Sequence, residues 1–120
     1  MTTAHDGKQV LVVDDNRAVL RILEQWLTGA GYVVVACDRF ETAKRHLAET
    51  PPDVLLTDVR LGAFNGLQLV ILAKEQQPRT VAIAMSAFDD PILRRDAALC
   101  GAAYLAKPFT HEQVLASLDG

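Results

Sequence analysis

Short apolar runs alternate with longer amphipathic segments along almost the whole chain of 120 residues. The apolar runs, which we expect to be strands, cover residues 10–13, 32–37, 54–57, 81–85 and 103–106. In the intervening segments apolar residues recur at helical spacing, so each segment can turn one face toward a core. Strands without a polar face, separated by helices, are typical of a parallel sheet covered on both sides. The pattern predicts one α/β domain over residues 1–120, a (βα)5 fold with a doubly wound, five-stranded parallel sheet. For the strand order we expect 2-1-3-4-5, the order of flavodoxin-like folds, which is one of the common doubly wound orders.

The starts of several expected helices carry their own signals. Three capping sequences are present: Asp38 with Glu41, Asp90 followed by Pro91, and Thr110 with Gln113. A capping side chain accepts hydrogen bonds from the free N–H groups of the first helical turn, and proline suits the first helical position because no N–H is needed there. We therefore expect helices to begin near these residues, and two others to cover about 16–28 and 67–77.

Charge and composition exclude several classes of protein. The formal net charge is −3, whereas nucleic-acid-binding domains usually carry a basic face. The apolar runs are far shorter than the roughly 20 residues that cross a bilayer, and the N-terminus lacks a secretory signal. Cys37 and Cys100 lack metal-ligand spacing and are interpreted as buried free thiols. We expect a cytoplasmic domain that binds neither nucleic acid nor membrane.

Polar residues stand where the expected strands end. Asp14 and Asp15 follow the first strand, Asp58 the third, Ser86 the fourth and Lys107 the fifth. In an open parallel sheet these ends share the edge at which ligands bind. Neighbouring strands lie about 4.8 Å apart, so Asp15 and Asp58 can share one cation, and a lysine side chain can span much of the distance from the fifth strand. Clustered carboxylates need a proton or a cation, and oxygen ligands suit Mg²⁺, or Mn²⁺ in its place. Such a site can support phosphoryl transfer to a carboxylate.

Each of these residues also has an ordinary structural explanation when taken alone. Asp14 and Asp15 can cap a helix, Asp58 can lie in a turn, and Lys107 can be a solvated charge. All of these explanations would have to coincide on one edge of one sheet, so we prefer the phosphoryl-transfer site. The remaining aromatic and imidazole side chains are interpreted as packing or as exposed: Trp26, His5, His46 and His111.

Several motifs occur in order at the expected strand ends, namely Asp14-Asp15, Asp58, Ser86-Ala87, Lys107-Pro108-Phe109, and the stretch Gly101-Ala-Ala-Tyr-Leu-Ala-Lys-Pro. Together they resemble the receiver domain of two-component response regulators, over essentially the whole chain. The resemblance implies a signalling switch, not a metabolic enzyme. By that resemblance Asp58 would accept a phosphoryl group from the phosphohistidine of a sensor histidine kinase or a phosphotransfer protein.

The resemblance also implies how the site is assembled. Asp15, Asp58 and the backbone carbonyl of Arg60 would bind Mg²⁺ directly, and Asp14 would act largely through water. Lys107 would pair with the phosphoryl group.

A switch is implied as well. Ser86 would turn its hydroxyl toward the phosphate, and Tyr104 would move inward, although a tyrosine on a strand is often only packing. Ala87 is small and would leave the site accessible. The output surface would be formed by the fourth helix, fifth strand and fifth helix, through which a monomer would dimerise on phosphorylation.

Two departures from the family pattern bear on this interpretation. Gly62 stands where the family usually has proline, so we expect a looser loop over residues 61–66. Arg60 and Phe88 occupy positions that tune phosphoryl lifetime in the family, and a bulky Phe88 leads us to expect slow self-dephosphorylation.

Three alternatives stay open. A Mg²⁺-dependent aspartyl phosphohydrolase usually has a second aspartate two residues after the nucleophile, where this chain has Arg60. A flavin or nucleotide carrier needs a phosphate loop after the first strand, where the chain has Asp-Asp-Asn-Arg. A degenerate receiver would bind partners without being phosphorylated. A DNA-binding or enzymatic output domain can also follow residue 120.

Overall fold

The computed structural model describes residues 7–119 and shows five helices around a parallel sheet. The strands are β1 (Gln9–Val13), β2 (Val33–Cys37), β3 (Val54–Asp58), β4 (Arg60–Leu61), β5 (Phe64–Asn65), β6 (Val81–Ser86) and β7 (Ala102–Ala106). The helices are α1 (Arg17–Gly29), α2 (Phe40–Glu49), α3 (Leu67–Gln76), α4 (Pro91–Leu99) and α5 (His111–Leu118). None of the described helices is long and apolar enough to cross a membrane.

The main sheet has the order β2-β1-β3-β6-β7, with every neighbouring pair parallel. β6 and β7 are its fourth and fifth strands, so the predicted order 2-1-3-4-5 and the flavodoxin-like fold are confirmed. The two remaining strands, β4 and β5, form a separate antiparallel pair.

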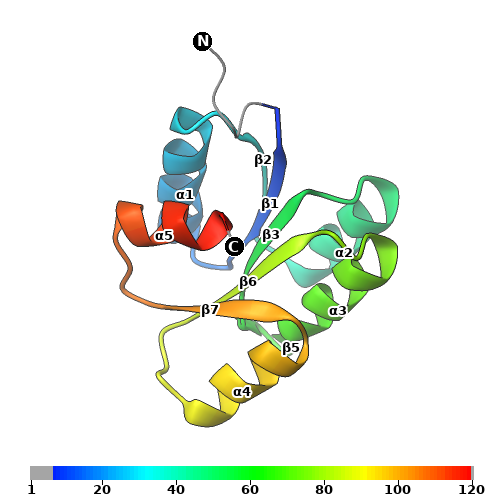
Figure 1. Cartoon of the computed structure of the whole chain (residues 1–120), viewed down its shortest axis with the longest axis vertical. Helices are drawn as coiled ribbons and strands as arrows, with labels where there is room; N and C mark the ends of the chain where they lie inside the picture. The colour runs from blue at the N-terminus through cyan, green and yellow to red at the C-terminus, as the bar shows by residue number, and fades with distance from the viewer. Residues whose placement is uncertain (1–6, 120) are drawn as a thin grey trace.

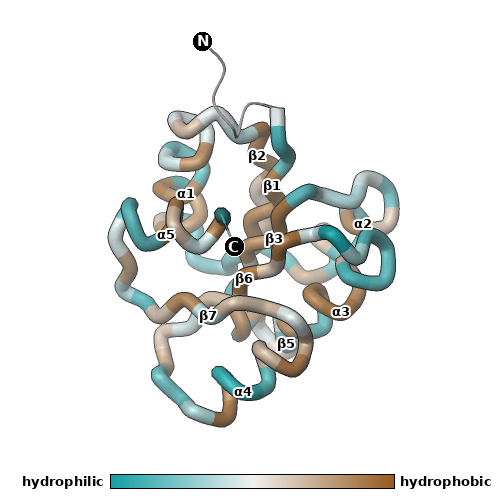
Figure 2. Tube along the Cα trace, viewed as in Figure 1, coloured by the Kyte–Doolittle hydropathy of each residue, from teal (hydrophilic) through white to brown (hydrophobic). Residues whose placement is uncertain are grey.

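Two apolar layers lie between the sheet and the helices. α1 and α5 cover one face of the sheet, and α2, α3 and α4 cover the other (Figure 1). β3 runs through the middle, and all five of its residues are buried. Hydrophobic residues accordingly follow one another along the central strands, while hydrophilic ones gather on the helices and loops (Figure 2). Burial on both faces explains why the strand sequences show no polar alternation.

Two of the three predicted caps are confirmed and one is wrong. Asp90 is confirmed: its carboxylate accepts a hydrogen bond from the Ile92 N–H, and Pro91 follows at the first helical position. Thr110 and Gln113 are confirmed as well, because the side chain of each accepts a hydrogen bond from the backbone N–H of the other. Helix α2 begins one residue later than the pattern of Asp38 and Glu41 indicates, because its N-cap is Arg39, which makes no side-chain cap. The Asp38 carboxylate instead forms a salt bridge with Arg17 at 3.0 Å.

The segment after Asp58 is more regular than its sequence led us to expect. β4 and β5 form a hairpin in which Arg60 lies opposite Asn65 and Leu61 opposite Phe64, and the looseness of this loop stays a prediction. Gly62 begins the two-residue turn with φ of +61°. A type II′ turn requires positive φ at that position, and proline is fixed near −65°. Glycine at this place therefore permits the hairpin.

Candidate functional site

Three carboxylates meet at the carboxyl edge of the sheet. Asp14 and Asp15 directly follow β1, and Asp58 is the last residue of the neighbouring strand β3. Each offers a carboxylate oxygen within 4.8 Å of the other two. Asp14 is fully buried and Asp58 is 8% exposed, whereas Asp15 is exposed to solvent. The site therefore combines buried negative charge with one open side.

Lys107 brings positive charge to this cluster from the end of β7. Its Nζ donates a hydrogen bond to Asp14 Oδ2 at 2.7 Å and lies 3.6 Å from Asp58 Oδ2. Its backbone N–H donates to the carbonyl of Ser86 at 2.8 Å, which joins the end of β7 to the end of β6. The lysine spans the sheet as expected, but its closest partner is Asp14, a pairing that the sequence did not predict.

Ionisation of Asp58 is disfavoured in the folded chain. The pKa of this carboxyl is raised from 3.8 to about 6, chiefly because burial penalises the charged form and then because Asp14, and less so Asp15, adds negative charge nearby. Lys107 and a hydrogen bond from the backbone N–H of Arg60 lower the pKa, but by less. Three carboxylates around one lysine leave excess negative charge. Their oxygen donors fit a hard divalent cation such as Mg²⁺ or Mn²⁺.

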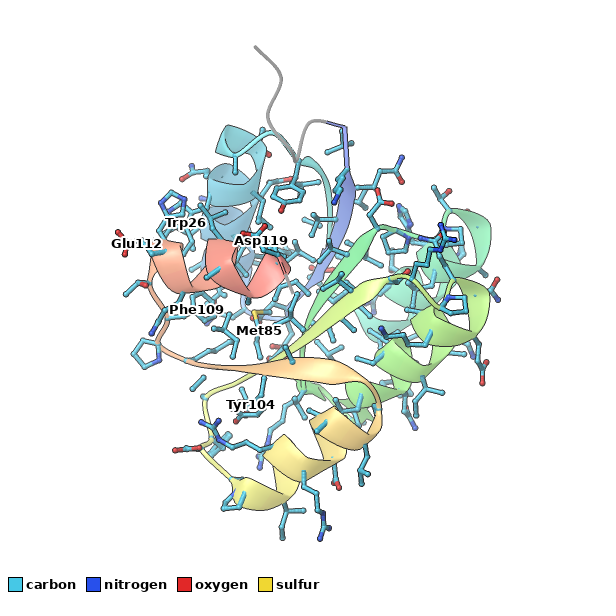
Figure 3. The ribbon with its side chains drawn as sticks, viewed as in Figure 1. Trp26, Met85, Tyr104, Phe109, Glu112 and Asp119 are labelled. Carbon is cyan, nitrogen blue, oxygen red and sulfur yellow. The ribbon has the colours of Figure 1, made fainter. Side chains whose placement is uncertain are left out.

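Ser86 and Tyr104 both contact Phe88. The buried Ser86 Oγ accepts a hydrogen bond from the Phe88 N–H at 3.1 Å, and the Tyr104 hydroxyl donates to the Phe88 carbonyl. Tyr104 is half-buried between β7 and α4 (Figure 3), where the Arg94 guanidinium lies 4.5 Å above its ring. The strand end that carries Ser86 is thus connected through one residue to the face formed by β7 and α4.

Two features of the site were missed at the level of sequence. The Arg60 guanidinium lies 4.1 Å from the centre of the Phe88 ring, so the residues that follow β3 and β6 are in direct contact. Gly66 packs so tightly that a Cβ there would lie 1.9 Å from the backbone oxygen of Asp58. A lone glycine just before an apolar helical segment was the only sequence signal for this close approach.

Other candidate residues lie away from the acidic cluster. His111 is exposed, as expected, and also stacks on Trp26 with ring centres 4.9 Å apart. Phe109 meets the same indole edge-on at 6.4 Å (Figure 3). These rings join α1 to the start of α5. Cys37 is a buried free thiol as predicted, whereas Cys100 is only partly buried. The remaining histidines are His46, which is half-buried, and His5, which lies outside the described residues.

An open flavodoxin-like sheet with an acidic cluster and a lysine at its carboxyl edge defines a class of α/β domain that can bind a divalent cation at this edge. Comparison with known proteins identifies the family. The model of the response regulator receiver domain matches residues 10–119. The DNA-binding transcriptional regulator NtrC of Proteus hauseri is 35% identical over 92% of this chain, and the match covers 24% of that protein. The chain thus spans about a quarter of the length of such relatives.

Solved structures agree with this assignment. A response regulator from Burkholderia pseudomallei, solved with a phosphorylated aspartic acid, calcium ion and citrate, has a TM-score of 0.86 and 28% identity, over 92% of this chain and 66% of that one. The chemotaxis response regulator CheY4 of Vibrio cholerae has a TM-score of 0.85 and 25% identity, over 94% of this chain and 97% of that one. The chain belongs to the response regulator receiver domain family, and is a signalling domain of the two-component type.

Proposed function

We propose that this domain is a phosphoacceptor switch that takes a phosphoryl group onto Asp58 in a Mg²⁺-dependent reaction. The phosphoryl donor is the phosphohistidine of a sensor histidine kinase or of a phosphotransfer protein. The observation that carries the proposal is the buried Asp58 carboxylate, with two further carboxylates within 4.8 Å and the Lys107 ammonium at 3.6 Å. A lone buried carboxylate would simply remain protonated, whereas here Lys107 offsets part of the negative charge, the oxygen donors suit a divalent cation that would offset the rest, and the site has one open side.

Metal binding is the first step that the site supports. Asp15 and Asp58 would hold Mg²⁺, or Mn²⁺ in its place, together with the backbone carbonyl of Arg60, while Asp14 acts through water. A bound divalent cation offsets the excess carboxylate charge and stabilises negative charge on a transferred phosphoryl group. The calcium ion and phosphorylated aspartic acid in the Burkholderia pseudomallei response regulator support this assignment by analogy.

The protein side chains then have distinct tasks in phosphoryl transfer. A carboxylate oxygen of Asp58 attacks phosphorus, the bond from phosphorus to the donor imidazole breaks, and the imidazole nitrogen keeps the electron pair. Lys107 shifts from Asp14 toward a phosphoryl oxygen, and only a small movement is needed because its Nζ already lies 3.6 Å from Asp58. The exposed, small Ala87 leaves room for the donor on this side.

The switch depends on the hydrogen bond that the Ser86 hydroxyl accepts from the Phe88 N–H. When this hydroxyl turns toward the phosphate, the hydrogen bond from the Phe88 N–H is lost, and Phe88 also holds the Tyr104 hydroxyl. Tyr104 then moves inward, and the surface formed by α4, β7 and α5 changes. We propose that the domain dimerises or contacts a target through this surface. Sedimentation before and after phosphorylation tests this, and an unchanged sedimentation coefficient argues against dimerisation.

The limits of the domain also belong to the proposal. Residues 1–120 form a single receiver domain, and an output domain after residue 120 is consistent with relatives about four times as long. The cytoplasmic location stays a prediction.

Intact mass measurement tests the central proposal. The protein is incubated with acetyl phosphate or phosphoramidate, with and without Mg²⁺, beside the Asp58→Asn variant. We expect a Mg²⁺-dependent gain of one phosphoryl group that the variant does not show. Mg²⁺ binding without an adduct would favour a degenerate receiver, and release of inorganic phosphate over many turnovers would favour the phosphohydrolase.

A further inference from the structure

The β4–β5 hairpin is attached directly to the phosphorylation site. Its first residue, Arg60, follows Asp58 by two positions, and the backbone N–H of Arg60 lowers the pKa of the Asp58 carboxyl. The hairpin is closed at Gly66, whose N–H donates to the carbonyl of Val59, the residue that directly follows β3, at 2.6 Å. A displacement of the hairpin therefore moves the Arg60 backbone relative to Asp58.

An aromatic stack attaches the far strand of this hairpin to α2. The rings of Phe64, in β5, and Phe40, the first residue of α2, are 4.5 Å apart and inclined by only 6°. Phe40 is buried in the core, whereas Phe64 remains 42% exposed. On the opposite strand Leu61 is buried below the hairpin. β4 is thus held by the burial of Leu61 in the core, and β5 is held by the stacking of Phe64 on Phe40.

A cavity that side chains do not fill lies beside this stack. Its volume is about 210 Å³, and it is lined by residues that include Asp15, Leu61, Gly62 and Phe64. Because this cavity opens beside the acidic cluster, the hairpin is not supported by close packing on its Asp15 side. The contact between Phe64 and Phe40 is therefore well placed to determine where the hairpin rests.

We infer that the stack of Phe64 on Phe40 is a clamp that fixes the Arg60 backbone against Asp58 and so sets the Mg²⁺ affinity of the acidic cluster. This inference rests on the proposed function, because it concerns the metal site on which phosphorylation depends. Phe64 acts as a positioning residue, because its side chain has no ligand atom for a cation and it acts through the ladder that pairs Leu61 with Phe64 and Arg60 with Asn65. Gly62 stands where the family usually has proline, so in this chain the Phe64 ring would hold the loop in place of that proline.

Calorimetric titration of the unphosphorylated protein with Mg²⁺ tests the clamp. Phe64→Ala removes the ring, Phe64→Tyr keeps the stacking face, and Ile71→Ala removes an equally exposed apolar side chain (46%) on α3 as a matched control. Stacked aromatic pairs contribute enough that we expect Phe64→Ala to raise the Kd for Mg²⁺ about three- to tenfold. Phe64→Tyr and Ile71→Ala should stay within about twofold of the unsubstituted protein. Circular dichroism establishes that all variants remain folded.

The outcomes separate the clamp from the proposed function. If Phe64→Ala binds Mg²⁺ as tightly as the unsubstituted chain, or if Ile71→Ala weakens binding equally, the clamp is refuted while phosphorylation of Asp58 stands. If the unsubstituted chain neither binds Mg²⁺ nor gains a phosphoryl group, the proposed function fails and the clamp fails with it. A metal-affinity defect confined to Phe64→Ala, and restored by tyrosine, supports the inference.

Discussion

Replacing Asp58 with asparagine should stabilise the fold in the absence of metal. The reason is that Asp58 ionises at a pKa of about 6 in the folded chain and at 3.8 when free, so its charge is more costly in the folded state. Below both values the carboxyl is protonated in the folded and the unfolded chain, and it carries no penalty. As the pH rises from 3.8 toward 6 the unfolded chain ionises first, which favours unfolding.

The size of the effect follows from these two pKa values. At pH 7.5 the penalty is fully developed and amounts to about 3 kcal/mol, whereas at pH 4 it is about 0.5 kcal/mol. Asparagine has nearly the same shape and can still accept the hydrogen bond from the Arg60 N–H. We therefore expect Asp58→Asn to raise the free energy of unfolding by up to about 3 kcal/mol at pH 7.5 and by much less at pH 4.

Urea denaturation followed by circular dichroism, in the presence of a chelator, measures this difference at both pH values. Because the two proteins share every other titrating group, the change in their difference with pH reports Asp58 together with its electrostatic coupling to Asp14, Asp15 and Lys107. Saturating Mg²⁺ should reduce the difference in free energy of unfolding between the two proteins at pH 7.5, since a ligand that binds the folded state of the unsubstituted protein stabilises it. A gain that is equal at both pH values, or a variant that is less stable at pH 7.5, would refute the reasoning.

Three further predictions concern the surroundings of Asp58. Gly66→Ala should lower the free energy of unfolding by about 3 kcal/mol in urea denaturation, because its Cβ would lie 1.9 Å from the Asp58 oxygen, while Gly29→Ala, with no atom within 4 Å, should be neutral or slightly stabilising. Lys107→Gln should raise the pKa of Asp58 above its value of about 6, measured by NMR of the carboxyl carbon, and an unchanged or lower pKa would contradict the charge balance described for the site. Phe88→Ala should accelerate hydrolysis of the phosphorylated form, followed by intact mass over time, and an unchanged half-life would show that the ring does not shield the phosphoryl group.

The fold was accessible from the sequence because its signals are local and repeated. Each buried strand is an uninterrupted apolar run, and each run is followed by a segment of helical spacing, so the order of elements could be read directly. The three aspartates could be placed for the same reason, since a parallel sheet brings consecutive strand ends to one edge. Asp14, Asp15 and Asp58 accordingly meet at the edge where they were expected.

What escaped prediction depends on competition between side chains and on distant contacts. The sequence places Lys107 within reach of Asp58, but only the structure shows that the more deeply buried Asp14 is its closer partner. Helix α2 begins one residue later than expected, with Phe40 as its first residue and buried in the core, and Asp38 is left to pair with Arg17.

The β4–β5 hairpin was hidden for a different reason. Its strands have two residues each, too short for any hydrophobic period to reveal. Gly62 was recognised as a departure from the family pattern, but a glycine by itself does not distinguish an irregular loop from a turn that needs a positive φ.

Arg60 contributes to the site through two separable parts. Its backbone N–H bonds to Asp58, while its side chain lies over the Phe88 ring. Every amino acid except proline supplies the same backbone group, so a mutation at this position exchanges the side chain and leaves the amide in place. If Asp58 is phosphorylated as proposed, a substitution here would change what lies beside the phosphoryl group, whereas the backbone amide that faces Asp58 would stay.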